Sequence, residues 1–523
     1  MASMYPFISA VLALAIVIPS LGGQNLSDQD RTANAIALAR QGKFVEAERE
    51  LRLAVSAAPA VGLYRAQLGS VLGLQGKWKA ALESFQKAVQ LSPGNLDFRR
   101  ETAAVQWQMG LLSGAETNLQ YVLGKHPQDP GAILLLGLVK EKKGDYPKAA
   151  HLLDSQFDLV SSQPERTVAL FHSVVESKQG DKMPKLLEAL KFHAKDPSWA
   201  AALTRCTQLA LKAEDLQTAA TLFPLISASD PDRPATSVGL ARLLYNSGQV
   251  SQAKELLLQL KSQGVENADL EMLLGNCFES ERQPEQAIAA YRRAIDAEPS
   301  QIARYEDLVS LLLYLHRTAD AEAFVKQALT LAPNDSRPWV WKGNADLRRN
   351  DYKGAMESYQ HAVHLDRKNP DALFGVAAAF YVTGQNDAAM SECKMGISRF
   401  PNDSRFYVSY AEMLVASPDA MQRQAEAKDL LSKALKLAPE SAQAHYLLGQ
   451  IALQQGQLEE AEKYFLHSLA FDPDRSKTHF ALSRVYRRMG RPEQAAKEIA
   501  LYQHLKGAED TGNTTPLAMP ENQ

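Results

Sequence analysis

Cysteine, aromatic residues and net charge are all in short supply in this chain. Three cysteines among 523 residues exclude a disulfide-stapled scaffold and any four-cysteine zinc or iron–sulfur site. Aromatic residues make up 7%, and runs of valine, isoleucine and threonine are few, so the composition favours helices over sheet. Lysine and arginine number 57 against 60 acidic residues, which gives a formal net charge of −3. General nucleic-acid binding needs a broad basic surface, and this composition does not provide one.

Long apolar runs are lacking too, except at the N-terminus. The stretch Phe7–Leu21 is apolar but shorter than the roughly 20 residues that span a bilayer, and small residues follow at Gly22 and Gly23. We expect residues 1–23 to be a signal peptide, so that the protein is exported to the periplasm or secreted. An uncleaved membrane anchor over residues 7–21 and a buried helix are the alternatives. Membrane contact is expected only through an uncleaved N-terminus.

Prolines recur along the chain with a period of 34 residues. The spacing holds in several separate series, namely Pro59, Pro93 and Pro127, then Pro197 and Pro231, then Pro299 and Pro333, then Pro439 and Pro473. Proline has no backbone N–H and ends a helix, so the period indicates a repeated helical unit that closes at each proline.

The residues between the prolines repeat as well. Counting from Gly62, Leu68-Gly69 stand at positions 7 and 8, Ala81 at 20 and Phe85 at 24. Equivalent residues occupy these positions in the segments that begin at Ala268, Ser336 and Ala442. They are Leu274-Gly275, Ala287 and Tyr291, then Gly343, Ala355 and Tyr359, then Leu448-Gly449, Ala461 and Phe465. This pattern resembles the tetratricopeptide-repeat family over roughly residues 28 to 506.

The resemblance implies an all-α, right-handed superhelical solenoid of about 14 helix-turn-helix repeats. Small residues at positions 8 and 20 would let the two helices approach, and position 24 would fill the space between them. Glycine at position 15, as at Gly76 and Gly180, predicts the turn between the helices. We place insertions of about two residues near Ser161–Pro164 and about four at Ala416–Met421, inside a turn.

Residues 160–235 fit the repeat pattern poorly, and either a hinge or ordinary drift of the repeat would account for them. With the two insertions, the repeats begin near Asp28, Gly62, Leu96, Pro130, Arg166, Ala200, Pro234, Ala268, Ile302, Ser336, Pro370, Ser404, Ala442 and Ser476. The segment 507–523 lacks apolar periodicity and is expected to be a disordered tail.

No catalytic, cofactor or metal motif emerges, so we expect no enzyme activity and no cofactor in this chain. Cys206, Cys277 and Cys393 fall at or near core positions of three different repeats and are interpreted as buried thiols. His361 and His364 could hold a metal by their spacing, but no third ligand accompanies them, which favours a solvated surface pair.

In tetratricopeptide repeats the first helices line a concave groove, to which positions 2, 5, 9, 12 and 13 contribute. The resemblance therefore predicts partner-binding residues at those positions here. They are Asn276, Tyr314, Val340, Asn344, Phe374, Tyr381, Val408, Tyr446, Phe480, Arg484, Arg487 and Arg488. Burial of the apolar members under neighbouring helices is the alternative interpretation.

We expect a non-catalytic scaffold, located in the cell envelope, that binds a partner protein or an extended peptide in this groove. The alternative function is an accessory, substrate-presenting subunit of a separate enzyme such as a glycosyltransferase. The last repeat is basic, with eight lysines and arginines from Arg475 to Lys506 against Glu493 and Glu498. This charge indicates either a polar cap or a local contact with an acidic partner or lipid headgroups.

Overall fold

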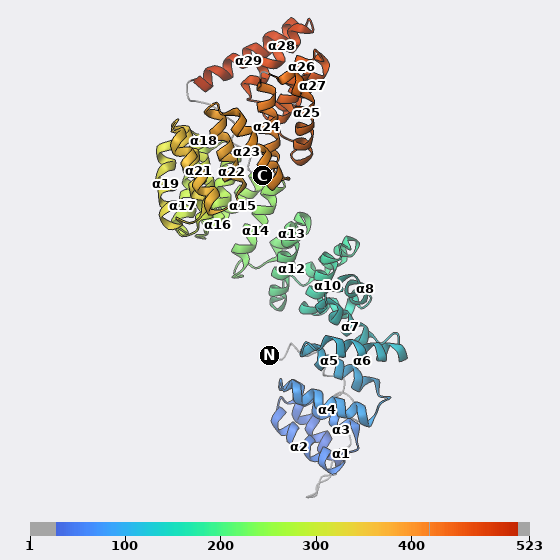
Figure 1. Ribbon diagram of the computed structural model, residues 1–523. Helices are drawn as coiled ribbons and strands as arrows, with labels where there is room; N and C mark the ends of the chain where they lie inside the picture. Colours follow the sequence, from blue (N-terminus) through green and yellow to red (C-terminus); the bar gives the residue numbers. More distant parts are fainter. Residues whose placement is uncertain (1–27, 418, 511–523) are drawn as a thin grey trace. The chain divides into compact units, whose positions relative to one another are not determined.

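The computed structural model describes residues 28–417 and 419–510, which form 29 α-helices, a few short 3₁₀ turns and no strand (Figure 1). The expected signal peptide, and the expected tail beyond Asp510, lie outside the described residues. The last helix continues past Gly507 to Asp510. None of the described helices is both long enough and apolar enough to cross a membrane. The all-α repeat fold is confirmed.

The chain divides into two compact units, Met1–Leu260 and Lys261–Gln523. In the first unit, consecutive helices pair as antiparallel hairpins, seven in all, with the short α9 as an extra helix. The helices are α1 Asp28–Arg40, α2 Phe44–Ala57, α3 Gly62–Leu74, α4 Trp78–Leu91, α5 Leu96–Gln108, α6 Leu112–Lys125, α7 Pro130–Lys142, α8 Tyr146–Asp154, α9 Phe157–Ser161, α10 Pro164–Glu176, α11 Met183–Phe192, α12 Ala200–Lys212, α13 Leu216–Leu222, α14 Arg233–Asn246 and α15 Val250–Ser262, which ends just beyond the division.

The second unit consists of seven further hairpins, which brings the described residues to the expected 14. Its helices are α16 Ala268–Ser280, α17 Pro284–Ala297, α18 Tyr305–Tyr314, α19 Thr318–Leu331, α20 Ser336–Arg348, α21 Tyr352–Leu365, α22 Pro370–Val382, α23 Asn386–Arg399, α24 Ser404–Ala416, α25 Ala420–Leu437, α26 Ala442–Gln454, α27 Leu458–Phe471, α28 Ser476–Arg488 and α29 Pro492–Asp510. In each hairpin we call the first helix A and the second helix B.

Close packing of helix A on helix B explains the glycine at position 8. A methyl group built on Gly449 would lie 2.6 Å from the ring of Phe465, and one built on Gly69 would lie 2.8 Å from Phe85. Both rings are fully buried. The aromatic residue at position 24 therefore occupies the space that the missing side chain leaves, as the sequence predicts.

The turn between helices A and B requires a left-handed residue at position 15. Glycine supplies it in eight of the described repeats, for example at Gly76 (φ 75°). Other residues supply it in five, namely Glu214, Arg282, His316, Asn350 and, in the fifth repeat, Lys178 (φ 57°). Gly180, predicted to make that turn, instead starts a short 3₁₀ turn and has no positive φ. The fifth repeat therefore begins at Pro164 rather than Arg166, and the two inserted residues lie after its turn.

The second expected insertion is also placed differently by the structure. Helix α24 ends at Ala416 and α25 begins at Ala420, so the turn between them has its ordinary length. Helix α25 has 18 residues, against 14 in α23 and α27. The four extra residues thus add one helical turn at the start of α25 instead of enlarging the loop.

A recurrent hydrogen bond closes the joint between one repeat and the next. The side chain at position 4 of helix A meets the backbone carbonyl of the proline six residues earlier. The pairs are Tyr305 with Pro299, Trp339 with Pro333, Tyr407 with Pro401, His445 with Pro439 and His479 with Pro473, at 2.9–3.1 Å. Each proline lies two residues beyond the end of helix B, as Pro299 does beyond Ala297, so the bond pairs a loop carbonyl and ties the loop between repeats to the next helix A.

The three cysteines form no disulfide and are fully buried, in agreement with the core positions assigned to them. Burial raises the pKa of the Cys393 thiol to about 12 and raises that of Cys206 further. Thiolates are the reactive form of cysteine, so these two side chains act as small apolar residues at neutral pH.

Candidate partner-binding site

The structure separates the twelve predicted partner-binding residues into buried and accessible groups. Val340 and Val408 are 6% and 9% exposed and belong to the apolar core of the second unit. The prediction that they line an open wall is not met, because neighbouring helices cover these short side chains. All twelve residues lie in helices α16 to α28, within the second unit.

The larger aromatic residues of the set reach the surface. Tyr314 and Phe480 are 45% and 43% exposed, and Phe374, Tyr381 and Tyr446 are half-buried. We call these five residues the aromatic stripe. Two of its members are held from below: Phe374 packs edge-on against Phe406, and Tyr446 packs on Phe465. The five residues of the aromatic stripe lie on helices α18, α22, α26 and α28.

Asn276 and Asn344 are held in place by tyrosines of their own repeats. Tyr359 donates its hydroxyl proton to the amide oxygen of Asn344 at 2.6 Å, and Tyr291 lies 2.7 Å from the equivalent oxygen of Asn276. Both asparagines are half-buried. With the oxygen engaged, the amide N–H groups are the part of each side chain left for a partner.

The three arginines of the set lie on α28 and are exposed. Arg488 donates a hydrogen bond to the backbone carbonyl of Leu453 at 3.1 Å. In the part of the chain that the structure describes, Arg484 and Arg487 have no carboxylate within ion-pair distance.

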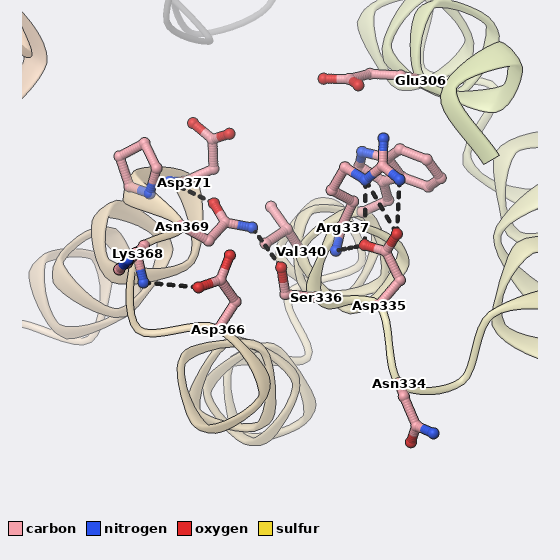
Figure 2. Close-up of a pocket in the computed structure, with 12 residues that line it drawn as sticks. Glu306, Asn334, Asp335, Ser336, Arg337, Val340, Asp366, Lys368, Asn369 and Asp371 are labelled. Carbon is pink, nitrogen blue, oxygen red and sulfur yellow. Dashed lines mark hydrogen bonds and ion pairs between the residues drawn. The ribbon is translucent and has the colours of Figure 1, made fainter.

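A hollow of about 640 Å³ opens beside the starts of helices α20 and α22 (Figure 2). Val340 and Trp341 form its apolar part, and charged side chains surround them. Asp335 grips Arg337 through a two-pronged ion pair at 2.6 Å, and Asn369 donates to the hydroxyl of Ser336 at 2.8 Å. Neighbouring repeats therefore shape one polar concavity, from positions 2 and 5 of their A helices and from the loops that precede α20 and α22.

Carboxylates around the hollow differ in their electrostatic environment. The Arg337 guanidinium holds the pKa of Asp335 below its usual range. Burial, together with the charges of Asp307 and Asp371, raises the pKa of Glu306 above its usual range. Glu306 would be stabilised in its charged form by an added cation, while Asp335 already has one.

Position 2 of the A helices is the feature that the sequence analysis left unused. Arg337, Asp371 and Arg405 occupy it in three successive repeats, and Arg405 bonds Asp371 at 2.7 Å. The signal was available in the sequence as charged residues of alternating sign at a spacing of 34.

No metal centre is present among residues 28–417 and 419–510, where no group of three or more histidine, cysteine, aspartate or glutamate side chains could hold an ion. His361 and His364 are exposed, and the ring of His361 lies 4.2 Å from that of Trp339. The pair is a surface feature, as expected.

Family models of the tetratricopeptide repeat match the chain in several places. One matches residues 32–95 and 420–476, others match 210–277 and 272–301, and a further repeat model matches 343–384. The chain belongs to the tetratricopeptide-repeat family. The matched segments lie in both units, in accordance with the helical hairpins described above.

Similar proteins include three relatives whose own lengths are much greater than the matched parts. Cellulose synthase operon protein C of Pseudomonas fluorescens is 23% identical over 331 residues, 62% of this chain and 22% of that protein. Human DnaJ homolog subfamily C member 7 is 25% identical over 207 residues, 37% and 41% of the two chains. Human protein O-mannosyl-transferase TMTC3 is 24% identical over 179 residues, 34% and 20%. The chain thus spans less than half the length of these relatives.

Among solved structures, the chain is similar to one in the APC/C hetero-tetramer Cut9–Hcn1. It is 15% identical with a TM-score of 0.42, covering 86% of this chain and 88% of that one.

Proposed function

We propose that this protein is a non-catalytic scaffold that binds a partner protein or an extended peptide along the A helices of its second unit. The aromatic stripe is the observation that carries the proposal. Exposed aromatic side chains, here on the A helices α18, α22, α26 and α28, are typical of partner sites, and tyrosine is enriched among the residues that contribute most of the binding energy in such interfaces. The half-buried asparagines add amide donors for a partner backbone.

Capture of the native partner from its own extract, followed by mass spectrometry, tests this proposal. The double variant Tyr314→Ala/Phe480→Ala removes two exposed rings and is expected to reduce capture at least about tenfold, since a hot-spot residue contributes about 2 kcal/mol. Tyr352→Ala is the matched control, because Tyr352 is 38% exposed but lies on a B helix. Equal capture by both variants, with unchanged circular dichroism, would contradict the proposal.

The proposal includes export, which the apolar run Phe7–Leu21 supports. Cell fractionation and N-terminal sequencing test it. A mature chain that begins near Gly23 or Gln24 in a soluble envelope fraction is expected. An intact Met1 in the membrane fraction would instead indicate an anchor, and an intact chain in the cytoplasm would contradict export.

The second candidate function is an accessory subunit that presents substrates to a separate glycosyltransferase. Similarity to the O-mannosyl-transferase TMTC3 favours it as an alternative. Transferase activity that co-purifies with the wild-type chain, and is lost with the Tyr314→Ala/Phe480→Ala variant, would support this function. Transferase activity in the purified single chain would overturn its assignment as non-catalytic.

A further inference from the structure

We infer that the last repeat, α28 with α29, docks an acidic segment of the partner protein. The inference rests on the proposed scaffold function and specifies the chemistry of one part of the partner. It comes from the surface formed by Lys477, Arg484, Arg487 and Arg488 around Phe480, which we call the basic face.

The basic face is one side of a strongly two-sided helix. Its five residues are spaced by three, four, three and one positions along α28, and all five are exposed. The opposite side of α28 is buried and includes Leu482, Val485 and Tyr486. Helical spacing of this kind gathers the four cations on one surface.

None of these cations has an ion-pair partner within the described residues. The arginines in the middle of the unit contrast with them: Arg405 contacts Asp371 and Asp403 at 2.7 Å each, and Arg304 contacts Asp269 and Glu298 at 2.7 and 2.9 Å. Four like charges on one helix face repel one another, so carboxylates supplied from outside would lower the electrostatic energy.

A polar cap alone does not account for the basic face. The first repeat of the array is also terminal, and its charges are mixed in sign and include ion pairs: Arg31 contacts Glu50 at 3.3 Å and Arg52 contacts Glu48 at 2.8 Å. Solubility at the end of an array requires polar residues, but it does not require unpaired charges of one sign.

The exposed aromatic ring of Phe480 among the charges indicates the kind of partner that the basic face binds. Phe480 lies between Lys477 and Arg484 at 43% exposure, with Tyr502 of α29 at a ring distance of 5.1 Å. The face therefore offers an apolar centre with guanidinium groups around it, which suits a peptide that has acidic and apolar side chains. Nucleic acid is disfavoured because the chain as a whole has a net charge of −3.

The aromatic stripe continues onto the basic face, since Phe480 belongs to both. Tyr446, on the preceding A helix, is covered on one side by the guanidinium of Arg475 at 5.4 Å from the ring. A segment lying along the stripe would thus reach the basic face at its end, which places the acidic residues at one terminus of the bound segment.

Fluorescence anisotropy with labelled peptides of about twelve residues tests the inference, because that length spans several A helices when extended. The probe contains two phenylalanines and four glutamates, and a matched peptide has glutamines in place of the glutamates. The full chain is expected to bind the glutamate probe at least about tenfold more tightly, and the preference should shrink at high salt. Equal affinity for both peptides would overturn the inference.

Arg484→Glu/Arg487→Glu should abolish the preference, and Arg484→Gln/Arg487→Gln should reduce it. Arg399→Glu is the control at an exposed, unpaired arginine of α23, and it should leave the preference intact. An equal loss with Arg399→Glu would contradict the inference. So would binding to phosphatidylglycerol vesicles without binding to the glutamate peptide, which would assign the face to lipid.

Capture of the native partner separates this inference from the proposed function. If Tyr314→Ala/Phe480→Ala loses the partner while Arg484→Glu/Arg487→Glu retains it, the scaffold function stands and the acidic segment is refuted. If neither variant changes capture, the proposed function fails as well.

Discussion

The B helices of this array differ in length. In α4, α6, α19 and α27 the B helix has 14 residues, whereas α8, α11 and α13 have 9, 10 and 7. The short ones belong to three consecutive repeats; α11 and α13 lie in the stretch 160–235, whereas α8 precedes it. Shortening of the B helix does not by itself change the period. The repeats of α8 and α13 still span 34 residues, from Pro130 to Pro164 and from Ala200 to Pro234, because α9 and the 3₁₀ turn Phe223–Leu225 take up the remaining residues, and only the repeat of α11 is longer, by two.

Proline accounts for the shortest of them. Helix α13 stops at Leu222 because Pro224 disfavours the helical conformation of the residue before it, and Phe223–Leu225 form a 3₁₀ turn instead. In regular repeats the closing proline lies at position 32, after the B helix is complete.

The joints differ as well. Regular joints bond a position-4 side chain to the carbonyl six residues earlier. In the irregular stretch an arginine reaches a carbonyl seven residues earlier, from Arg166 to Leu159 at 3.0 Å and from Arg233 to Ile226. Arginine also serves in two regular joints, where Arg65 and Arg99 bond the carbonyls of Pro59 and Pro93, so the irregular joints differ in the spacing of donor and acceptor rather than in the donor residue.

The largest expected effect concerns Glu101, which is an exception within a regular repeat. Its side chain is 1% exposed, and one carboxyl oxygen has no hydrogen-bond partner. Burial raises its pKa from 4.5 to about 8. The folded state therefore holds a proton that the unfolded state loses above pH 4.5, so this group's contribution to stability falls as pH rises from 4.5 through 8 and is level above that.

Glu101→Gln removes this titration. We expect it to stabilise the first unit at pH 9 relative to pH 5 by a few kcal/mol, since each pKa unit corresponds to about 1.4 kcal/mol. Hydrogen exchange of helices α3 to α6 at the two pH values measures the effect after correction for intrinsic rates. An equal change in protection at both values would show that Glu101 is charged in the folded state.

The second prediction tests the close packing of regular repeats. Gly449→Ala places a methyl group 2.6 Å from the ring of Phe465 and should lower the free energy of unfolding by about 1–3 kcal/mol. Gly239→Ala in α14 is the comparison, because the added methyl would meet only the end of Leu211, at 3.0 Å. Chemical denaturation followed by circular dichroism checks both. Equal effects would mean that the helices of a regular repeat can move apart.

The third prediction compares the two kinds of joint. Tyr305→Phe keeps the buried ring but removes the donor to Pro299, at an expected loss of about 1 kcal/mol. Arg166→Met removes the donor from the irregular joint and should cost less, because that bond is exposed to water. Thermal unfolding measures both variants. A larger loss at Arg166 would reverse the comparison.

The smallest expected effect concerns the turn of the fifth repeat. Lys178→Gly should stabilise the chain by up to about 1 kcal/mol, because lysine holds a left-handed conformation there. Gly180→Ala should not destabilise it, since Gly180 has no positive φ and nothing lies within 4 Å of the added methyl. Calorimetry checks the pair. No stabilisation by Lys178→Gly together with destabilisation by Gly180→Ala would show that Gly180, not Lys178, makes the turn.

How far the sequence predicts this molecule depends on the kind of feature. The starts of α3, α16, α20 and α26 at Gly62, Ala268, Ser336 and Ala442 agree with the repeat register. The predicted start of the fifth repeat was wrong by two residues. The turn was assigned to Gly180 because glycine favours a left-handed conformation, whereas Lys178 adopts that conformation in the structure.

Accessibility was harder to predict than position in a repeat. Val340 and Phe374 share position 5, yet one is buried and the other is half-buried. Exposure depends on the length of the side chain and on what the adjacent helix contributes, and neither can be inferred from the residue's own place in the repeat. The hollow beside Glu306 could not be predicted from the sequence for the same reason, since charged residues from three successive repeats form it.

The position-4 joint bond has a consequence for how such an array changes over generations. Tyrosine, tryptophan, histidine and arginine all make it here, so the joint selects for a donor rather than for one residue. Any repeat with a donor at position 4 can follow any repeat whose B helix is followed, two residues later, by proline. The same hydrogen bond can therefore form between any two such repeats, and the duplication or deletion of a whole repeat preserves this bond at the new joint.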